Sequence, residues 1–295
     1  MMRKVVWATL AFGIAALAGP ARAQELMPEQ SAAKAKQVLQ QVIAALGGPA
    51  YLNVRDTDCD GRIAQFGTND QLMGYTMFRD MWILPDKNRT EYIAKGERTF
   101  LAFFVGVDDL SITHGGIMVT IFDGKEGWLL DKSGVSSQPA DWVTAFANQL
   151  ETGMNNVLRT RLKEPGVEVS YGGPDIIDMK EAEWIDFNDA KHRDLRLAAD
   201  RLTHLPLRWV VVTRDPDTRI RTEVVTSYTE YMPTDGVQTP LNIVRSRNGQ
   251  KLTQTFLTGC KYDSNLDAQL FTRASLDEQA AQVAKKGYKK TKDKN

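Results

Sequence analysis

The segment over residues 117–134 constrains the fold of this chain more than any other stretch. Its sequence, IMVTIFDGKEGWLLDKSG, places two apolar, β-branched runs on either side of Asp123 and Gly124. Asp-Gly supplies the positive φ angles of a tight turn, so the segment is predicted to form a β-hairpin. The sequence SSQPADWVTAF follows directly and is typical of the start of an amphipathic helix. Together they predict one curved antiparallel sheet with a helix laid across it.

Hydrophobic periodicity predicts helices at two places and strands over most of the remaining chain. Apolar residues recur at helical spacing over residues 28–46, before Gly47-Gly48, and again from Pro139 until Pro165-Gly166. Alternating or continuous apolar runs predict strands. These runs start near residue 54 and cover 71–84, 89–94, 184–187, 194–198, 207–213, 222–232, 241–247 and 252–262. Turn sequences separate the last four runs, which favours a meander of antiparallel hairpins.

The first residues have the organisation of a secretory signal peptide. Arg3 and Lys4 precede an apolar run over residues 5–19, and Ala21-Arg22-Ala23 supplies an A-x-A cleavage site. The alternative is a membrane anchor, but the run is shorter than the roughly 20 apolar residues that span a bilayer. We therefore expect a signal peptide over residues 1–23, cleavage near Ala23 and a soluble periplasmic or secreted protein.

The mature chain is predicted to form a single domain over residues 24–284, a length that suits one large all-β domain. The full chain has 37 basic and 37 acidic residues. Removal of the signal peptide leaves it slightly acidic, which disfavours a broad nucleic-acid-binding surface. Basic residues concentrate in the segment 285–295, KKGYKKTKDKN. This segment is predicted to be a disordered, solvated tail, and the alternative is a patch for anionic lipid head groups.

The chain has two cysteines, Cys59 and Cys260. Each lies in a strand-like segment on the same face as apolar residues, and an oxidising compartment would allow them to pair. A disulfide between them would close a loop of about two hundred residues and constrain the unfolded chain. The alternative is a pair of buried free thiols. Without a C-x-x-C motif, a redox-active role is not expected.

The sequence contains no constellation of the kind that enzymes use. His114, His192 and His204 are isolated and lack metal-ligand spacing. No nucleophile elbow, phosphate-binding loop or dinucleotide fingerprint occurs. Adjacent carboxylates such as Asp108 and Asp109 are more typical of solvated surface than of acid–base chemistry. We therefore predict a protein that is not an enzyme and that binds no metal or cofactor.

The predicted strand over residues 71–84 is partly apolar on both faces. One face carries Met73, Tyr75, Met77, Met81 and Ile83, and the other carries Leu72, Phe78, Trp82 and Leu84. A strand with one face in water should not show this pattern. Either helices cover its outer face, or its inner face lines a cavity. Methionine and aromatic side chains adapt to irregular ligands such as acyl chains, whereas the alternative is an ordinary packed core.

Four features occur in a characteristic order: a signal peptide, a first helix ending in Gly-Gly, a long strand ending WILPDKNRTEY, and TIFDGKEGW followed by a helix. In this the chain resembles the periplasmic lipoprotein-sorting carriers of the LolA-like fold. The runs YMPTDGVQTPLNIVRSRNGQKLTQTFL and YDSNLDAQLF are similar to the C-terminal half of outer-membrane lipoprotein-sorting-like proteins. The resemblance covers nearly all of the mature chain. It implies a mainly β fold: a curved, half-open antiparallel β-barrel covered by α-helices, with an apolar cavity that shelters lipid chains.

The resemblance also implies roles for individual residues. Asp123, Gly124 and Trp128 match the hairpin motif of the family, and Pro85 matches the proline after the second strand. The lipoprotein carriers have an arginine before that proline, contacting the helical lid, where this chain has Leu84, and this argues against the lipoprotein-specific cycle. The residues expected to bind lipid in the cavity and the lid are Phe78, Trp82, Leu84, Trp128, Trp142, Phe146, Leu150 and Met154.

The predicted function is that of a periplasmic carrier or binding protein that holds lipids or acylated lipoproteins non-covalently, as a monomer without a cofactor. Its expected partners are acyl chains, an inner-membrane exporter and an outer-membrane acceptor, and not nucleic acid. The alternative is an interaction or sensor module of the cell envelope with the same fold. A hydrolase of envelope lipids would require a polar catalytic cluster inside the cavity.

Overall fold

The computed structural model describes residues 26–93, 99–102, 110–113, 117–189, 194–215 and 217–292. The predicted signal peptide, Asp108, Asp109, His114 and His192 lie outside this part of the chain. The strands in chain order are β1 Asp56–Phe66, β2 Leu72–Ile83, β3 Lys87–Ile93, β4 Thr99–Ala102, β5 Leu110–Thr113, β6 Ile117–Phe122, β7 Gly127–Asp131, β8 Gly134–Ser137, β9 Glu168–Ile177, β10 Lys180–Asn188, β11 Asp194–Asp200, β12 Pro206–Arg214, β13 Arg221–Thr234, β14 Val237–Arg247 and β15 Gln250–Tyr262. The helices are α1 Pro28–Leu46, α2 Pro49–Leu52, α3 Ala140–Thr152, α4 Met154–Arg159 and α5 Arg273–Lys292, with 3₁₀ turns η1 Thr68–Asp70, η2 Arg161–Lys163 and η3 Ala268–Phe271.

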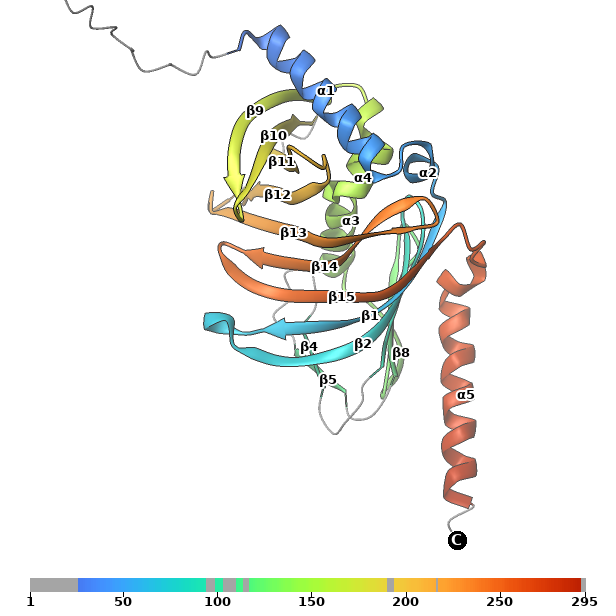
Figure 1. Ribbon diagram of the computed structural model, residues 1–295. Coiled ribbons are helices and arrows are strands. Elements are labelled where there is room, and N and C mark those ends of the chain that lie inside the picture. The colour runs from blue at the N-terminus through green and yellow to red at the C-terminus, as the bar shows by residue number, and fades with distance from the viewer. Residues whose placement is uncertain are drawn as a thin grey trace, which may run out of the picture.

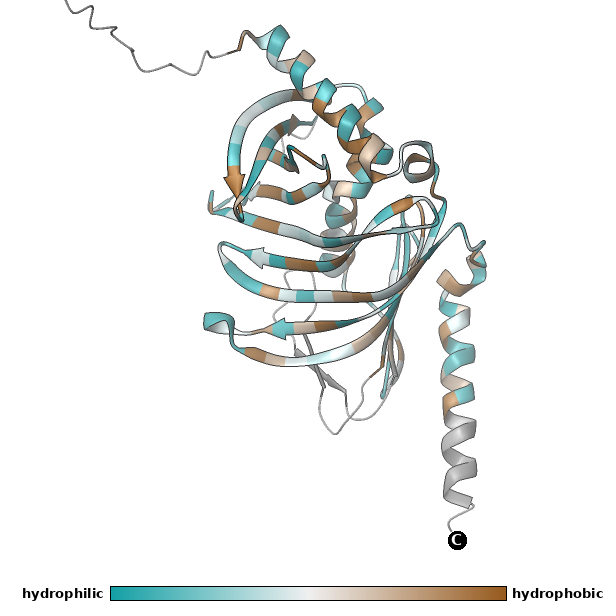
Figure 2. Cartoon of the chain, in the orientation of Figure 1, coloured by the Kyte–Doolittle hydropathy of each residue, from teal (hydrophilic) through white to brown (hydrophobic). Residues whose placement is uncertain are grey.

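One antiparallel sheet of 13 strands dominates the fold, while β4 and β5 form a separate two-stranded sheet. The order in the large sheet is β8-β7-β6-β3-β2-β1-β15-β14-β13-β12-β11-β10-β9. The strands β8 and β9 are its two edges, and Figure 1 shows that the sheet curves strongly without closing. Apolar and polar residues alternate along many of its strands (Figure 2), as expected when the two faces have different surroundings. The structure therefore confirms the predicted half-open antiparallel barrel covered by helices.

Helix α1 packs against the edge strand β9 and covers the neighbouring part of the concave face, where β10, β11 and β12 contribute core residues. Its apolar face buries Val38 and Val42, which belong to one core cluster with Leu158 of α4 and Trp209 of β12. The helix ends at Gly47, whose φ of 127° favours glycine. A side chain there would also collide with the backbone carbonyl of Gly236 in the turn between β13 and β14. The Gly-Gly pair after α1 thus ends the helix and allows close packing against the sheet.

Helices cover both faces of the last part of β2, which explains the apolar residues there, whereas Leu72, Met73 and Tyr75 at its start are exposed. On the concave face, Trp82 packs with Phe146 of α3. On the convex face, Met81 lies in a cluster with Phe271 of η3 and Leu276 of α5. The sequence left two explanations open: helices over the outer face of the strand, or a cavity along its inner face. The structure shows both.

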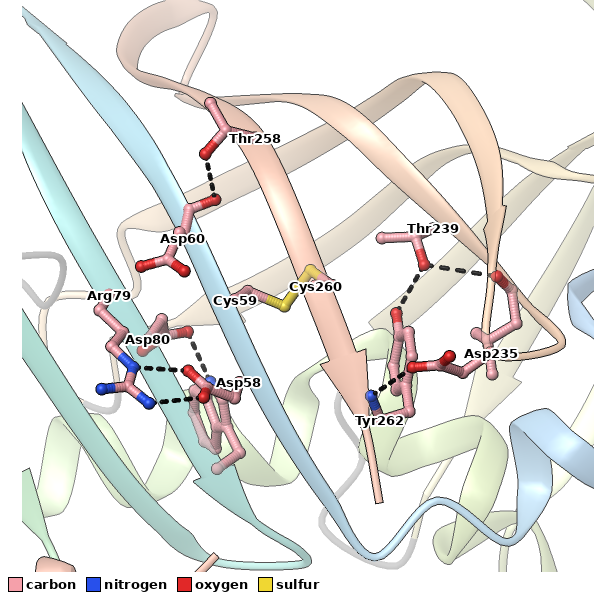
Figure 3. The surroundings of a disulfide bond; sticks show 12 residues. Asp58, Cys59, Asp60, Arg79, Asp80, Asp235, Thr239, Thr258, Cys260 and Tyr262 are labelled. Atoms are coloured by element: carbon pink, nitrogen blue, oxygen red, sulfur yellow. Dashed lines mark hydrogen bonds and ion pairs between the residues drawn. A yellow bond between two sulfur atoms is a disulfide. The ribbon is translucent and has the colours of Figure 1, made fainter. Parts of the chain in front are cut away.

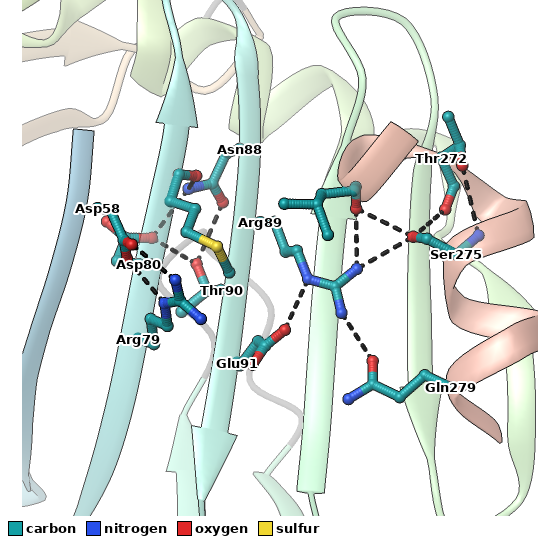
Figure 4. Close-up of polar contacts among 12 residues, drawn as sticks. Asp58, Arg79, Asp80, Asn88, Arg89, Thr90, Glu91, Thr272, Ser275 and Gln279 are labelled. Atoms are coloured by element: carbon teal, nitrogen blue, oxygen red, sulfur yellow. Dashed lines mark hydrogen bonds and ion pairs between the residues drawn. The ribbon is translucent and has the colours of Figure 1, made fainter. Parts of the chain in front are cut away.

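A buried arginine, Arg89 of β3, attaches the C-terminal segment to the convex face (Figure 4). Its side chain is only 4% exposed. The guanidinium donates hydrogen bonds to the carbonyl of Leu270 at 2.8 Å, to Ser275 Oγ at 3.1 Å and to Gln279 Oε1 at 2.7 Å. It also pairs with Glu91 at 2.8 Å. Because a buried guanidinium is costly unless its donors are satisfied, these contacts hold the first turns of α5 against the sheet.

Helix α5 corrects the predicted C-terminus. The sequence suggested that the domain ends at residue 284 and that a disordered tail follows, whereas the backbone is helical from Arg273 through Lys292. The density of lysines after residue 284 suggested a solvated coil. Alanine, glutamine and lysine are nevertheless good helix formers, and they extend a helix whose first turns are docked.

The hairpin predicted over residues 117–134 is present as β6 and β7. Phe122 pairs with Gly127, so the connecting loop has four residues, Asp123 to Glu126, rather than Asp-Gly alone. The Asp123 side chain accepts hydrogen bonds from the backbone N–H groups of Lys125 and Glu126, which closes this longer turn. The next strand, β8, is the sheet edge from which the chain crosses to α3.

Two other elements differ from the prediction. The single helix expected after Pro139 is divided at Gly153 into α3 and α4. Strand β9 lies in a region, residues 167–183, whose weak periodicity gave no strand prediction. It is an edge strand with Gly172, Gly173 and Pro174 inside it, residues that weaken the usual strand signal.

Cys59 and Cys260 form a disulfide, which resolves the alternative left open by the sequence. The pairing of β1 with β15 places the two cysteines directly opposite each other, with their Cα atoms 4.0 Å apart (Figure 3). They are separated by 201 positions in the sequence. The bond therefore joins the first strand of the sheet to the last strand in the chain.

Replacing both cysteines by alanine is expected to lower the free energy of unfolding by roughly 3–5 kcal/mol, because the disulfide closes a very long loop in the unfolded chain. Urea denaturation under oxidising conditions measures this difference. A thiol reductant should destabilise the wild type similarly and leave the double-alanine variant unchanged. A loss below about 1 kcal/mol would contradict the expectation.

Candidate functional site

A cavity of about 1040 Å³ lies between the concave face of the sheet and the helices α3 and α4. Its wall consists of inward-facing residues from β1, β2, β3, β12, β13, β14 and β15, and of residues from the two helices. This volume is at the upper end of the range for pockets that enclose small molecules. The concave face is therefore only partly filled by packed core.

Most of the residues predicted to bind lipid do line this cavity. They are Phe78, Trp82 and Leu84 on β2 and the residue after it, and Trp142, Phe146, Leu150 and Met154 on α3 and α4. The alternation of β2 directs its three side chains to the same face. The shared position of these residues follows from the sheet and helix assignments made from the sequence.

Trp128 is the exception, and its predicted place in the cavity is corrected. It pairs with Ile121 across β6 and β7, and both side chains lie in the convex-face cluster with Leu276 of α5. No helix was predicted over the outer face of the hairpin. Trp128 was therefore assigned to the cavity, the one apolar environment that the sequence predicted for it.

Four aromatic side chains form what we call the aromatic cluster at one end of the cavity: Trp82, Phe122, Trp142 and Phe146. The rings of Trp142 and Phe146 are stacked with centroids 4.9 Å apart, and the ring of Phe122 lies 5.1 Å from that of Phe146. A Cβ atom on Gly127 would lie 2.6 Å from the Trp142 ring, so glycine permits this approach. The cluster joins α3 to β2 and β6.

A buried carboxylate, Asp80, orients Trp82 within the aromatic cluster. One Asp80 oxygen accepts a hydrogen bond from Trp82 Nε1 at 2.6 Å. The other accepts from Asn88 Nδ2 at 2.9 Å and from Thr90 Oγ1 at 2.7 Å. Figures 3 and 4 show Asp80 behind the outward-facing ion pair of Asp58 and Arg79. Burial raises the pKa of Asp80, and the three hydrogen bonds oppose that shift.

Another part of the cavity wall, called the polar end below, is polar and cationic, a feature that the sequence prediction missed. Arg159 of α4 and Arg245 and Arg247 of β14 line it. Arg159 donates to the carbonyl of Tyr51 at 2.9 Å, and its guanidinium lies 4.3 Å from the centre of the Tyr51 ring. Arg245 donates to Gln149 Oε1 of α3 at 3.0 Å. Arg245 thus supplies a polar contact between the sheet and α3.

Neutral hydroxyl groups surround the arginines. Burial is the main cause of raised pKa values at the tyrosines of this end, Tyr51, Tyr228, Tyr231 and Tyr262. The Tyr51 hydroxyl donates to Asn155 Oδ1 at 2.9 Å, and the Tyr231 hydroxyl donates to the carbonyl of Pro206 at 2.8 Å. Threonines add hydroxyls along the inward face of the sheet: Thr213, Thr222, Thr226, Thr239, Thr253 and Thr255. The lining is therefore amphipathic, whereas the sequence predicted an apolar cavity.

A signal for the polar end was present in the strand pattern. Along β13, Thr222, Val224, Thr226 and Tyr228 share one face, and Arg245 and Arg247 share one face of β14. Such a face mixes apolar, hydroxyl and charged groups, which is unusual for packed core. The prediction for these strands concerned only their order and pairing, so the mixed face was not recognised as a cavity wall.

The described part of the chain offers little for catalysis or metal binding. It contains no group of three histidine, cysteine or acidic residues placed to hold a metal ion. Among the described residues of the cavity wall, Asp80 is the one carboxylate, and neither histidine nor serine occurs. His204 lies in the turn between β11 and β12. The catalytic cluster that a hydrolase would need inside the cavity does not occur among these residues.

Comparison with solved structures identifies the fold. The chain is similar to a DUF1329 family protein from Desulfovibrio piger, with a TM-score of 0.51 and 10% identity over 82% of this chain and 98% of that chain. It is also similar to a LolA superfamily protein from Nitrosomonas europaea, with a TM-score of 0.50 and 10% identity over 82% of this chain and 99% of that chain. No protein-family model and no curated protein matches the sequence. The chain has a LolA-like fold, as its sequence predicts.

Among the helices within the described residues, none has both the length and the apolar character that a membrane span requires.

Asp80 predicts a pH dependence of stability. Because its pKa is raised in the folded protein, the folded state keeps this proton at a higher pH than the unfolded chain does. Its contribution to stability is therefore greatest in acid and declines as pH rises above the ordinary value of about 4. Relative to Asp80→Asn, the wild type should lose stability between about pH 4 and pH 7, as measured by urea denaturation across that range.

The control for this experiment is Asp215→Asn. The backbone N–H of Thr218 is the main cause of a lowered pKa at the exposed Asp215 carboxyl, so this variant should show the opposite pH trend relative to the wild type. A difference between wild type and Asp80→Asn that is independent of pH would contradict the raised pKa of Asp80.

Proposed function

We propose that the protein is a carrier or binding protein that holds the acyl chains of lipids or lipoproteins in the cavity between the sheet and α3. The observation that carries this proposal is the cavity of about 1040 Å³, with the aromatic cluster, Phe78 and Leu150 in its wall. The LolA-like fold supports this proposal, because its curved sheet forms one wall of the cavity. Neither catalysis nor a cofactor forms part of the proposed activity.

Burial of acyl carbons supplies enough free energy for such binding. Each buried methylene contributes about 0.8 kcal/mol, so ten methylenes contribute about 8 kcal/mol before the cost of association. The cost of association, about 4–15 kcal/mol, is subtracted from this figure, so tight binding needs more than ten buried methylenes. The apolar wall then determines affinity, while polar groups on the opposite wall determine which amphiphiles fit.

Helix α3 is the proposed lid of the cavity. It lies between the sheet edge β8 and the break at Gly153. It contacts the sheet through the aromatic cluster, through the Arg245–Gln149 hydrogen bond, and at its last residue through the hydrogen bond from Trp209 Nε1 to the carbonyl of Thr152 at 2.8 Å. Displacement of the first part of α3 would separate the first two contacts and open the cavity. In this proposal Arg245 provides the polar sheet-to-lid contact that Leu84 cannot make.

The predicted signal peptide places the proposed carrier in the periplasm. It would act there as a monomer, receiving its ligand from an inner-membrane donor and delivering it to an outer-membrane acceptor. The disulfide between Cys59 and Cys260 is consistent with an oxidising compartment.

The test is binding of a fluorescent fatty-acyl probe to the purified, delipidated protein. Wild type should bind with an increase in fluorescence. Leu150→Asp should weaken binding about tenfold or more, because it places a charge against the apolar part of the ligand. The matched control is Ile176→Asp on β9, since Ile176 is 73% exposed and lies outside the cavity wall. Circular dichroism checks that both variants fold.

Two outcomes would contradict the proposed function. One is a wild type that does not take up the probe. The other is equal affinity for the probe in wild type, Leu150→Asp and Ile176→Asp.

A further inference from the structure

The polar end of the cavity holds positive charge without a matching carboxylate. Among the described residues, no carboxylate lies within ion-pair distance of Arg159, Arg245 or Arg247. The one carboxylate in the described cavity wall, Asp80, already accepts hydrogen bonds from three side chains at the aromatic end. The cavity therefore carries a net positive charge at one end.

Arg245 is the clearest case. It is partly buried, and its one hydrogen bond from the guanidinium within the described chain goes to the neutral amide oxygen of Gln149. Its neighbour Arg247 faces the same cavity and repels it. Burial is the main reason that the pKa of Arg245 falls to about 10, a value at which the side chain is still cationic near neutral pH.

Arg159 stands on the helical side of the same space. Burial lowers its pKa, and the groups that oppose this shift are the hydroxyls of Tyr51 and Tyr262 and, more weakly, the carboxylate of Asp263. Asp263 is already paired with Arg55 at 3.3 Å.

We infer that this end of the cavity binds the anionic head group, a carboxylate or a phosphate, of an acyl lipid. Arg245 would contact the anion, with Arg247 beside it on the same face of β14, and the hydroxyls of Tyr228 and of the neighbouring threonines would donate further hydrogen bonds. The acyl chain would then extend toward the aromatic cluster. This inference rests on the proposed function and specifies the chemical class of its ligand.

The physical reason is the cost of an uncompensated charge. A guanidinium removed from water without a counter-charge is unfavourable, and an incoming anion that pairs with it offsets this cost. Guanidinium groups also bind carboxylate and phosphate through two parallel hydrogen bonds, which a neutral head group cannot match. The protein should therefore discriminate between two ligands that have the same chain and differ only in head-group charge.

The experiment uses dibromostearate and dibromostearyl alcohol, which share a chain and differ in charge. Bromine atoms quench tryptophan fluorescence at short range, and Trp82, Trp142 and Trp209 line the cavity. Wild type should bind the carboxylate about tenfold more tightly than the alcohol, the difference expected of one charge-assisted contact. Arg245→Gln should remove most of this preference, measured as the ratio of the two affinities.

Two further variants separate charge recognition from structure. Arg245→Lys keeps the charge and should keep most of the preference. Arg221→Gln is the matched control, because Arg221 lies on the adjacent strand β13, pairs with Glu223 at 2.6 Å and is not part of the cavity wall. It should bind both ligands as the wild type does. Thermal unfolding of each variant checks that the fold is intact.

Competition distinguishes a lipid head group from a free anion. A monoacyl phosphate should displace dibromostearate, whereas inorganic phosphate at about 10 mM should not, because it lacks the apolar contribution of the chain. Displacement by inorganic phosphate alone would overturn the assignment to a lipid.

The remaining outcomes are also decisive. If wild type binds both brominated ligands equally and Arg245→Gln changes neither affinity, the head-group inference is wrong and the proposed carrier function stands. If Arg245→Gln loses both ligands, Arg245 supports the cavity rather than recognising charge, and the inference is overturned. If wild type binds neither ligand, the proposed function itself fails.

Discussion

The cavity depends on a mismatch between one wide concave surface and the few helices that cover it. A curved sheet of 13 strands presents more inner surface than α1, α3 and α4 occupy. Helix α1 packs tightly against β10 to β12 with α4, and α3 packs against β2 and β6 through the aromatic cluster. Between these two contacts, inward-facing residues of β13, β14, β15 and β1 line the open cavity, and α3 reaches β14 through the Arg245–Gln149 hydrogen bond. The disulfide between β1 and β15 lies in this middle part of the sheet and joins two of these strands.

The outer face shows the complementary arrangement. Helix α5 and η3 cover the convex side of β2, β6 and β7, and the buried Arg89 joins them to the sheet through side-chain and backbone acceptors. If α3 acts as the proposed lid, it can leave the concave side of β2 while the convex side of that strand stays covered. This division gives a firmly attached outer helix and an inner helix held by aromatic contacts and by hydrogen bonds from Arg245 and Trp209. A carrier requires such a difference, because its ligand must enter and leave while the sheet keeps its shape.

The features that local physics determines were predictable from the sequence. Helical spacing before Gly47 gave α1, and turn sequences between apolar runs gave the hairpins from β12 to β15. The alternation of Phe78, Trp82 and Leu84 correctly placed three side chains on the cavity wall. Other features depend on which elements meet in space. The outer position of Trp128 requires the first turns of α5, a helix that was not predicted from the sequence. The cationic residues come from β14 and α4, which both line the cavity. A local sequence pattern does not show which strand and helix meet in this way. Whether the cysteines pair depended on the β1–β15 register, which follows from the whole topology.

The central claim is that the cavity holds an amphiphile with an acyl chain. Native mass spectrometry of the full chain, secreted and purified without detergent, tests it most directly. The account predicts a population heavier than the polypeptide by the mass of one lipid, which dissociates on collisional activation and appears as an anion. A single species at the mass of the mature polypeptide, both before and after incubation with total envelope lipids, would contradict it.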